Sequence, residues 1–298
     1  MTQRSPSPIL CIGSVLWDMI GRAPGPMRQG ADVPGRITRL PGGVAMNIAR
    51  TLAQFGQIPT LLSAVGRDSE GDELIAACAQ HGVGTDHIYR PADLPTDRYM
   101  AVEGANGLIA AIADAASLEA AGARILAPLS DGSLGHADAP FAGTIALDGN
   151  LTASLLAEIA NSPAFAAADL RVAPASPGKA ERLTPFLSHP RCTLYVNLEE
   201  AGLLCATRFD HAESAAAALL TQGAARVLVT DGAGPAAEAS PEGVISHTPP
   251  QVTVARVTGA GDTFMAAHIA AEAKGHRREA ALSRALVAAA RHVSGDTQ

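Results

Sequence analysis

The stretch Val252–Lys274, VTVARVTGAGDTFMAAHIAAEAK, decides the fold that this sequence predicts. Alternating β-branched residues predict a short strand over 252–257, and the alanine-rich run that follows has the apolar spacing of a helix. The glycine turn between them leaves backbone N–H groups exposed at the positive end of the helix, which attracts anions. The stretch therefore predicts an anion site at the start of a helix.

Two glycines and an aspartate make this turn suitable for phosphate chemistry. Gly259 and Gly261 have no Cβ, so a phosphate group can approach the backbone closely. Asp262 lies in the first helical turn, where its carboxylate could accept the proton of a hydroxyl group held beside that phosphate. The alternative interpretation makes Asp262 a helix cap and the glycines an ordinary turn.

Two better-known phosphate loops do not match. The dinucleotide fingerprint needs a third glycine three residues after Gly261, where Phe264 stands. A Walker loop needs Gly-Lys followed by Ser or Thr, but Gly178-Lys179 is followed by Ala180. A dinucleotide-dependent oxidoreductase is therefore the least favoured alternative.

The composition is that of a globular α/β protein. The 298 residues are enough for one large domain, and 47% of them are hydrophobic against 17% charged. A net charge of −7 argues against a nucleic-acid partner. The sequence has no signal core or membrane-spanning stretch, and its four scattered cysteines indicate neither zinc nor disulfides. We therefore expect a cytoplasmic protein that does not bind a membrane.

Polar residues follow the first predicted strand and open the first predicted helix. Asp18 comes shortly after the strand 9–12, at the sheet edge where open α/β folds bind ligands, and could accept hydrogen bonds from sugar hydroxyls. Gly42-Gly43 leads into a helix over 44–55, in whose first turn Asn47 offers a donor and an acceptor. Alternatively, Asp18 is a solvated loop residue and Asn47 belongs to an ordinary helix start.

Strands and helices alternate through the rest of the chain, which predicts a parallel sheet with helices on both faces. Further strands are predicted near 124–128, 144–149, 169–173, 192–197 and 225–230. A hairpin over 97–113, with Asn106-Gly107 in its turn, interrupts the alternation, and the segment 21–39 could add short strands. We expect one domain over 1–298 with a lid made of these two segments.

Three later strand ends carry polar residues, and Asp148-Gly149-Asn150 is the first of them. Asn197 and Glu200 open a predicted helix, where an acidic residue either offers an oxygen ligand to magnesium or compensates the helix dipole. Thr230 and Gly232 follow the next strand with a hydroxyl and a bare backbone. Both pairs are candidates for nucleotide contacts.

Taken in order, these motifs resemble the ribokinase (pfkB) family of carbohydrate kinases. The matching residues are Gly42-Gly43 with Asn47, Asn197 with Glu200, Thr230 with Gly232, and Gly259-Ala260-Gly261-Asp262. The resemblance implies a ribokinase-like three-layer α/β sandwich with a mostly parallel central sheet and a small β lid. It also implies phosphoryl transfer from Mg²⁺·ATP to a primary hydroxyl, and it allows a monovalent cation such as K⁺.

The resemblance implies a role for each residue. Asp262 would be the catalytic base, and the N–H groups of Gly259, Ala260 and Gly261 would stabilise the transferred phosphate. Glu200 would help to place Mg²⁺. The acceptor would be held by Asp18, Gly42, Gly43 and Asn47, and the nucleotide by Asn197, Thr230, Gly232 and Thr258. Such lids close over the sugar and often pair two subunits, so a homodimer is expected.

Within the family, several stretches are similar to pseudouridine kinases. They are 110–114, 148–151, 174–179 and 257–267. This similarity implies a C-nucleoside acceptor phosphorylated on its 5′-hydroxyl, with Lys179 facing substrate or phosphate unless it is an ordinary surface lysine. Arg256 and Ala173 depart from the family pattern, where acidic or amide residues are expected. A ribokinase-like sugar kinase and a nucleoside-binding protein without turnover therefore remain as alternatives.

Overall fold

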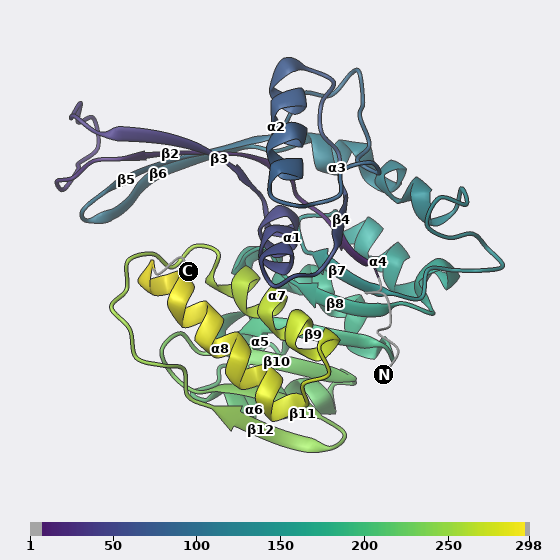
Figure 1. The fold of residues 1–298 in the computed structure, drawn as a ribbon. Coiled ribbons are helices and arrows are strands. Elements are labelled where there is room, and N and C mark those ends of the chain that lie inside the picture. The colour runs from purple at the N-terminus through teal and green to yellow at the C-terminus, as the bar shows by residue number, and fades with distance from the viewer. Residues whose placement is uncertain (1–7, 296–298) are drawn as a thin grey trace.

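The main body is built around an eight-stranded sheet (Figure 1). The structure is a computed structural model that describes residues 8–295. In sheet order the strands are β12 (Gly243–His247), β11 (Ala236–Ser240), β10 (Arg226–Thr230), β9 (Cys192–Asn197), β8 (Asp169–Ala173), β7 (Thr144–Asp148), β1 (Ile9–Ile12) and β4 (Pro59–Leu62). The strands β10, β9, β8, β7, β1 and β4 run parallel, and β11 and β12 add an antiparallel edge. The mostly parallel sheet confirms the predicted fold class.

Helices cover both faces of this sheet and give the three layers. Alternate residues of β1 belong to two different cores, since Ile9 and Cys11 pack on one face while Leu10 and Ile12 pack on the other. The first face carries α1 (Val44–Gln54), α2 (Ser69–Gln80), α7 (Ala260–Ala273) and α8 (Arg278–Ser294). The second carries α3 (Ser117–Ala121), α4 (Ala153–Asn161), α5 (Leu198–Leu204), α6 (Ala212–Thr221) and the 3₁₀ segments η1 (Gly122–Leu129), η2 (Pro163–Phe165) and η3 (Pro177–Ser188). Within residues 8–295, no helix is both long and apolar enough to cross a bilayer.

A separate four-stranded sheet projects from the main body (Figure 1). Its order is β3 (Arg36–Gly42), β2 (Leu16–Arg22), β5 (Arg98–Gly104) and β6 (Gly107–Asp114). The hairpin predicted over 97–113 is β5 and β6 with the expected turn. The segment predicted over 21–39 forms two strands that extend beyond those bounds. β2 begins earlier, at Leu16, and β3 ends later, at Gly42. We call this sheet the lid.

Two predicted strands are wrong. The run 124–128 lies in η1, where Pro128 has no N–H to donate and Ile125 and Leu129 bury a single face, as a helical turn does. The run 252–257 pairs with no strand, and Val257 is 70% exposed. Its β-branched residues favour extended backbone, but the N–H groups of Ala255 and Arg256 donate to the carbonyl oxygen of Val293 at the end of α8.

Candidate active site

The anion loop at the start of α7 is open to solvent. Gly259 is the N-cap residue in a left-handed conformation (φ +84°), and no side chain caps the first turn. A Cβ on Gly261 would meet no atom within 4 Å, whereas a Cβ on Gly259 would lie 3.1 Å from Nε2 of His292. The two glycines therefore serve different purposes, since Gly259 permits the backbone turn and Gly261 leaves space in front of the helix end.

Asp262 and Asn47, which are 215 residues apart in sequence, are joined by a hydrogen bond. Nδ2 of Asn47 donates to Oδ2 of Asp262 at 2.9 Å. On its other side Oδ1 of Asn47 accepts from Nη2 of Arg50 at 3.1 Å, which orients the amide so that its N–H faces the carboxylate. Burial raises the pKa of Asp262 to about 7, against the lowering effects of the Asn47 hydrogen bond and of Arg50. Asp262 can therefore exchange a proton near neutral pH.

Asp18 lies beside this pair but is not placed as predicted. It belongs to lid strand β2 instead of the loop that follows β1, because the lid begins directly after that loop. Burial raises its pKa to about 6, while Arg50 lowers it. A Cβ on Gly42 would clash with the Asp18 carboxylate, and one on Gly43 (φ +93°) would clash with the carbonyl of Ser14. Because neither glycine has a Cβ, the lid, the start of α1 and the loop after β1 can pack closely together at this point.

Asp148 is a buried carboxylate that holds several segments of the site together. Its Oδ2 accepts from the backbone N–H and the hydroxyl of Ser14, both at 2.8 Å, and from the N–H of Ala45 at 3.1 Å. Its Oδ1 accepts from the N–H of Asn150 at 2.8 Å. Burial is the main cause of its raised pKa, and these hydrogen bonds oppose the shift. The end of β7 therefore fixes both the loop after β1 and the start of α1.

Lys179 is connected to the same network. Its Nζ donates to Oδ1 of Asn150 at 2.6 Å, and Nδ2 of Asn150 donates to the hydroxyl of Ser14 at 2.9 Å. The lysine is half-buried and lies at the start of η3. The sequence predicts that Lys179 either faces substrate or phosphate or is an ordinary surface lysine, and this placement favours the first interpretation.

Most of the predicted nucleotide and magnesium residues lie at the ends of β9 and β10, whereas Thr258 precedes α7 and its carbonyl hydrogen-bonds to Nε2 of His292 at 2.8 Å. Asn197 pairs with Thr230 across the sheet, so the two strand ends are adjacent. Asn197 and Glu200 form a capping box, with the Glu200 N–H donating to Oδ1 of Asn197 and the Asn197 N–H to Oε2 of Glu200. Burial raises the pKa of Glu200 to about 7. The carboxylate therefore has a structural role at the start of α5, whatever else it binds.

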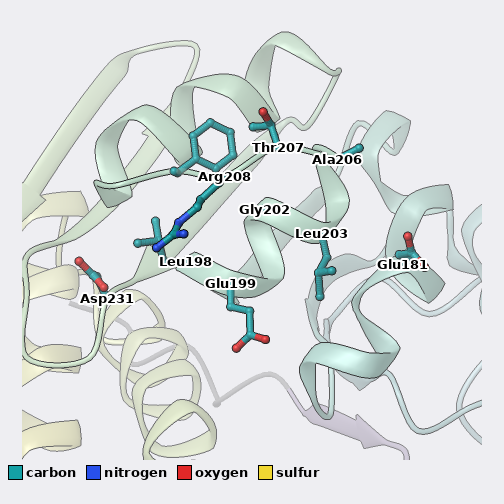
Figure 2. Close-up of a pocket in the computed structure, with 10 residues that line it drawn as sticks. Glu181, Leu198, Glu199, Gly202, Leu203, Ala206, Thr207, Arg208 and Asp231 are labelled. Atoms are coloured by element: carbon teal, nitrogen blue, oxygen red, sulfur yellow. The ribbon is translucent and has the colours of Figure 1, made fainter.

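A pocket of about 780 Å³ borders this end of the sheet (Figure 2). It is lined by Glu181, by residues of α5 and the loop after it, and by Asp231. None of the residues predicted for the site lines it, although its lining includes sequence neighbours of Asn197 and Thr230. Within the described chain, no group of three or more His, Cys, Asp or Glu side chains is arranged to hold a metal.

Of the predicted acceptor residues, Asn47 therefore contacts the predicted base Asp262 directly, and the predicted nucleotide residues Asn197 and Thr230 lie at adjacent strand ends. Sequence reasoning missed Ser14, Arg50 and Asp148 as members of the site. A signal existed for each, since Ser14 and Asp148 end neighbouring strands and Arg50 lies one helical turn after Asn47.

Comparison with known proteins identifies the family. The model of the pfkB family carbohydrate kinases matches residues 7–295. The pseudouridine kinase of Escherichia coli (strain K12) is 31% identical over 276 residues, which is 87% of this chain and 81% of that protein. A carbohydrate kinase structure from Agrobacterium tumefaciens superposes with a TM-score of 0.80 at 25% identity, covering 98% of this chain and 94% of that one. Ribokinase from Arabidopsis thaliana, complexed with ribose and ATP, gives 0.78 at 21% identity over 99% and 94% of the two chains. This chain therefore belongs to the pfkB family of carbohydrate kinases and is an ATP-dependent kinase.

Proposed function

We propose that this kinase transfers the γ-phosphate of ATP to the 5′-hydroxyl of pseudouridine. The observation that supports the proposal is the hydrogen bond between Asn47, the proposed acceptor-binding residue, and Asp262, the proposed base. The E. coli relative at 31% identity supports the choice of acceptor. Lys179 and Asn150, within stretches similar to pseudouridine kinases, are hydrogen-bonded to each other beside Ser14 and Asp148.

The proposed chemistry follows from the positions of these groups. The Asp262 carboxylate takes the proton of the 5′-hydroxyl as its oxygen forms a bond to the γ-phosphorus, and the bond from that phosphorus to the β,γ-bridging oxygen breaks. The N–H groups of Gly259 and Gly261, at a helix start that no side chain caps, stabilise charge on the transferred oxygens, and the N–H of Ala260 joins them once it leaves the carbonyl oxygen of Val257, to which it donates at 3.1 Å. Asp18 and Asn47 hold the ribose hydroxyls. Thr230, Gly232, Asn197 and Thr258 contact the nucleotide in this scheme.

Mg²⁺ fits this site as an ion that arrives with the nucleotide. Glu200 is the acidic candidate from the sequence, and within the described residues no group of three or more His, Cys, Asp or Glu forms an all-protein cage, so a contact through water is the role that we propose for it. When bound, Mg²⁺ would neutralise charge on the phosphates. A monovalent cation fits poorly, because Nε of Arg256 already donates to the carbonyl of His292 beside the anion loop. We therefore expect Mg²⁺ dependence without K⁺ dependence.

The lid offers a surface for the proposed homodimer. Ile37 on β3 is 76% exposed and Ile112 on β6 is 68% exposed, which is unusual for side chains of this size. Covering them with the lid of a second copy would bury apolar area on both partners. The homodimer and the cytoplasmic location both stay predictions.

A ribokinase-like sugar kinase is the second candidate, since Asp18 and Asn47 would serve the hydroxyls of a free sugar equally well. A binding protein without turnover is the third, because Arg256 and Ala173 depart from the family pattern.

Initial rates of ATP consumption separate these functions. Pseudouridine, 2′-deoxypseudouridine, uridine, ribose and fructose are compared at equal concentration. Pseudouridine should react fastest and its 2′-deoxy analogue poorly, because the analogue leaves buried polar groups unpaired. A clear preference for ribose or fructose would favour the sugar kinase. ATP binding with no turnover of any acceptor would favour the third candidate.

A further inference from the structure

A groove of about 960 Å³ is lined by residues of α1, α7 and α8. Helix α7 packs against both α1 and α8, and Figure 1 shows where these helices lie in the fold. The basic side chains that line the groove are Arg50, Arg256, Lys274, Arg284, Arg291, His81, His276 and His292. No aspartate or glutamate lines it, although the chain carries 29 acidic residues against 22 Lys and Arg. The groove therefore concentrates positive charge on an acidic protein.

The charges in the groove are little compensated by the protein itself, although the carboxylates of Asp18 and Asp262 act against the burial that lowers the pKa of Arg50. Within residues 8–295, no Lys or Arg of the groove forms an ion pair with a carboxylate, whereas arginines elsewhere, such as Arg90 and Arg278, do. Two of the groove arginines donate hydrogen bonds to neutral groups. Arg50 donates to the amide oxygen of Asn47, and Arg256 donates to the carbonyl oxygen of His292. Their remaining N–H donors stay available.

These cations also repel one another. Burial and, next, the charge of Arg256 lower the pKa of Arg50. Burial is the main cause of the lowered pKa of His292, and Arg256 and Arg50 lower it further. Bringing like charges together without a counter-ion has a free-energy cost, and a bound anion would relieve it.

The shape of the groove suits a small organic molecule with several anionic groups. Its floor is made of small α7 residues, including Ala267 and Ala271, and its walls include the apolar side chains of Phe55 and Val287. From Thr263 to Lys274, α7 rises by roughly 16 Å, and basic residues lie near both ends. Guanidinium groups match phosphate geometry, and apolar walls can accept a base or a carbon skeleton.

We propose that this groove is a second ligand site, which binds a small phosphorylated metabolite carrying more than one negative charge. It adjoins the anion loop without including it, since His292 at its end bonds to the carbonyl of Thr258 but Gly259, Gly261 and Asp262 do not line it. It nevertheless reaches the catalytic residues, because Arg50 lies in the groove and orients Asn47 against Asp262. A ligand there is therefore placed to regulate the proposed reaction.

Calorimetric titration with inorganic tripolyphosphate, without Mg²⁺ and without acceptor, tests the binding independently of turnover. The groove variant is Lys274→Ala/Arg284→Ala/Arg291→Ala. The matched control is Arg28→Ala/Arg36→Ala/Arg67→Ala, which removes the same charge from exposed side chains outside the groove. We expect the groove variant to weaken binding at least 10-fold and the control to change it less than 2-fold. The melting temperature of each variant verifies that its fold is retained. The single variant Lys274→Ala is used if the triple variant does not fold.

A third variant, Gly261→Val, separates the groove from the anion loop. Binding through the groove should survive this substitution, while binding lost in Gly261→Val and retained in the groove variant would overturn the proposal. Equal weakening in the groove variant and its control would also overturn it, since diffuse electrostatics would then be sufficient. Single-stranded DNA that binds and is not displaced by tripolyphosphate would instead indicate a nucleic-acid surface. Because these titrations measure binding and need no turnover, they can be interpreted even if the kinase assay detects no activity.

Discussion

Two helices begin at the carboxyl edge of the main sheet with an acidic residue in the first turn, and their ends are built differently. At the start of α5, the side chains of Asn197 and Glu200 satisfy each other's backbone N–H groups. At the start of α7, Gly259 offers no side chain and Asp262 turns instead to Asn47 on α1. The first helix end is closed by its own residues, and the second is left open for a ligand.

This difference indicates how to judge such aspartates and glutamates from structure. An acidic residue whose carboxylate accepts from its own helix end stabilises the fold first. An acidic residue whose carboxylate is held by a distant segment, beside uncapped N–H groups, is free to take part in chemistry. Five experiments test whether α5 and α7 differ in this way.

The largest expected effect is the loss of turnover in Asp262→Asn. The amide keeps the shape of the side chain but cannot accept the hydroxyl proton, so kcat should fall by roughly 10²–10⁴-fold. Nucleotide affinity, measured by calorimetry, should be largely retained. Glu200→Gln is the matched control on α5 and should keep most of the turnover. Asp262→Asn activity within a few-fold of the unsubstituted enzyme would remove Asp262 as the base.

The second effect concerns the space in front of α7. Gly261→Val places a branched side chain where open space now exists, and ATP affinity should fall at least about 10-fold, which is roughly 1.4 kcal/mol. The melting temperature should change little because the substituted position is exposed. Gly25→Val, at another glycine with open space around its Cβ, provides the control. Unchanged ATP affinity would mean that Gly261 serves only the turn.

The third test is the pH dependence of the proposed base. Because the pKa of Asp262 is raised to about 7, the reactive carboxylate is lost as the pH falls below that value. kcat should therefore decrease by about 10-fold per pH unit on the acidic side. Arg50 lowers this pKa, so Arg50→Met should move the acidic limb to higher pH. A profile flat between pH 5 and pH 8 would contradict a titrating base.

The fourth test measures the structural role of Glu200. Glu200→Ala removes one half of the capping box and should lower the free energy of unfolding by about 1 kcal/mol, visible in the melting temperature. Glu200→Gln keeps a carbonyl oxygen for the Asn197 N–H and should lose less. If Glu200 also helps to hold Mg²⁺, the glutamine variant should need more Mg²⁺ for half-maximal activity.

The smallest expected effect is that of K⁺. Replacing K⁺ by tetramethylammonium should leave the rate within about 2-fold, because Arg256 supplies a positive charge beside the loop. The variant Arg256→Asn lacks this charge, so we expect K⁺ to increase its rate. If K⁺ strongly activated the unsubstituted enzyme, Arg256 would not supply the positive charge that we assign to it beside the anion loop.

Local sequence signals predicted local structure well and long-range contacts poorly. The helix Ala260–Ala273 could be predicted to the residue, because a glycine turn and an alanine-rich run mark its start and interior. The strand expected over 252–257 failed because β-branched residues favour extended backbone without determining a partner. The contact of Asn47 with Asp262 was implied only by the family resemblance. Asp148 and Arg50 had local signals, but their contacts and the basic groove depend on how distant helices and strands pack.

The hydrogen bond between Asn47 and Asp262 has a consequence for how the enzyme is made. Asn47, the proposed acceptor residue, is synthesised early, but Asp262, the proposed base, follows 215 residues later. At translation rates of about 5–20 residues per second, the two halves of the site are separated by roughly 10–40 s of synthesis. A nascent chain on the ribosome can therefore complete β1, α1 and the lid and still have no base, so phosphorylation begins only after α7 has emerged and docked against α1.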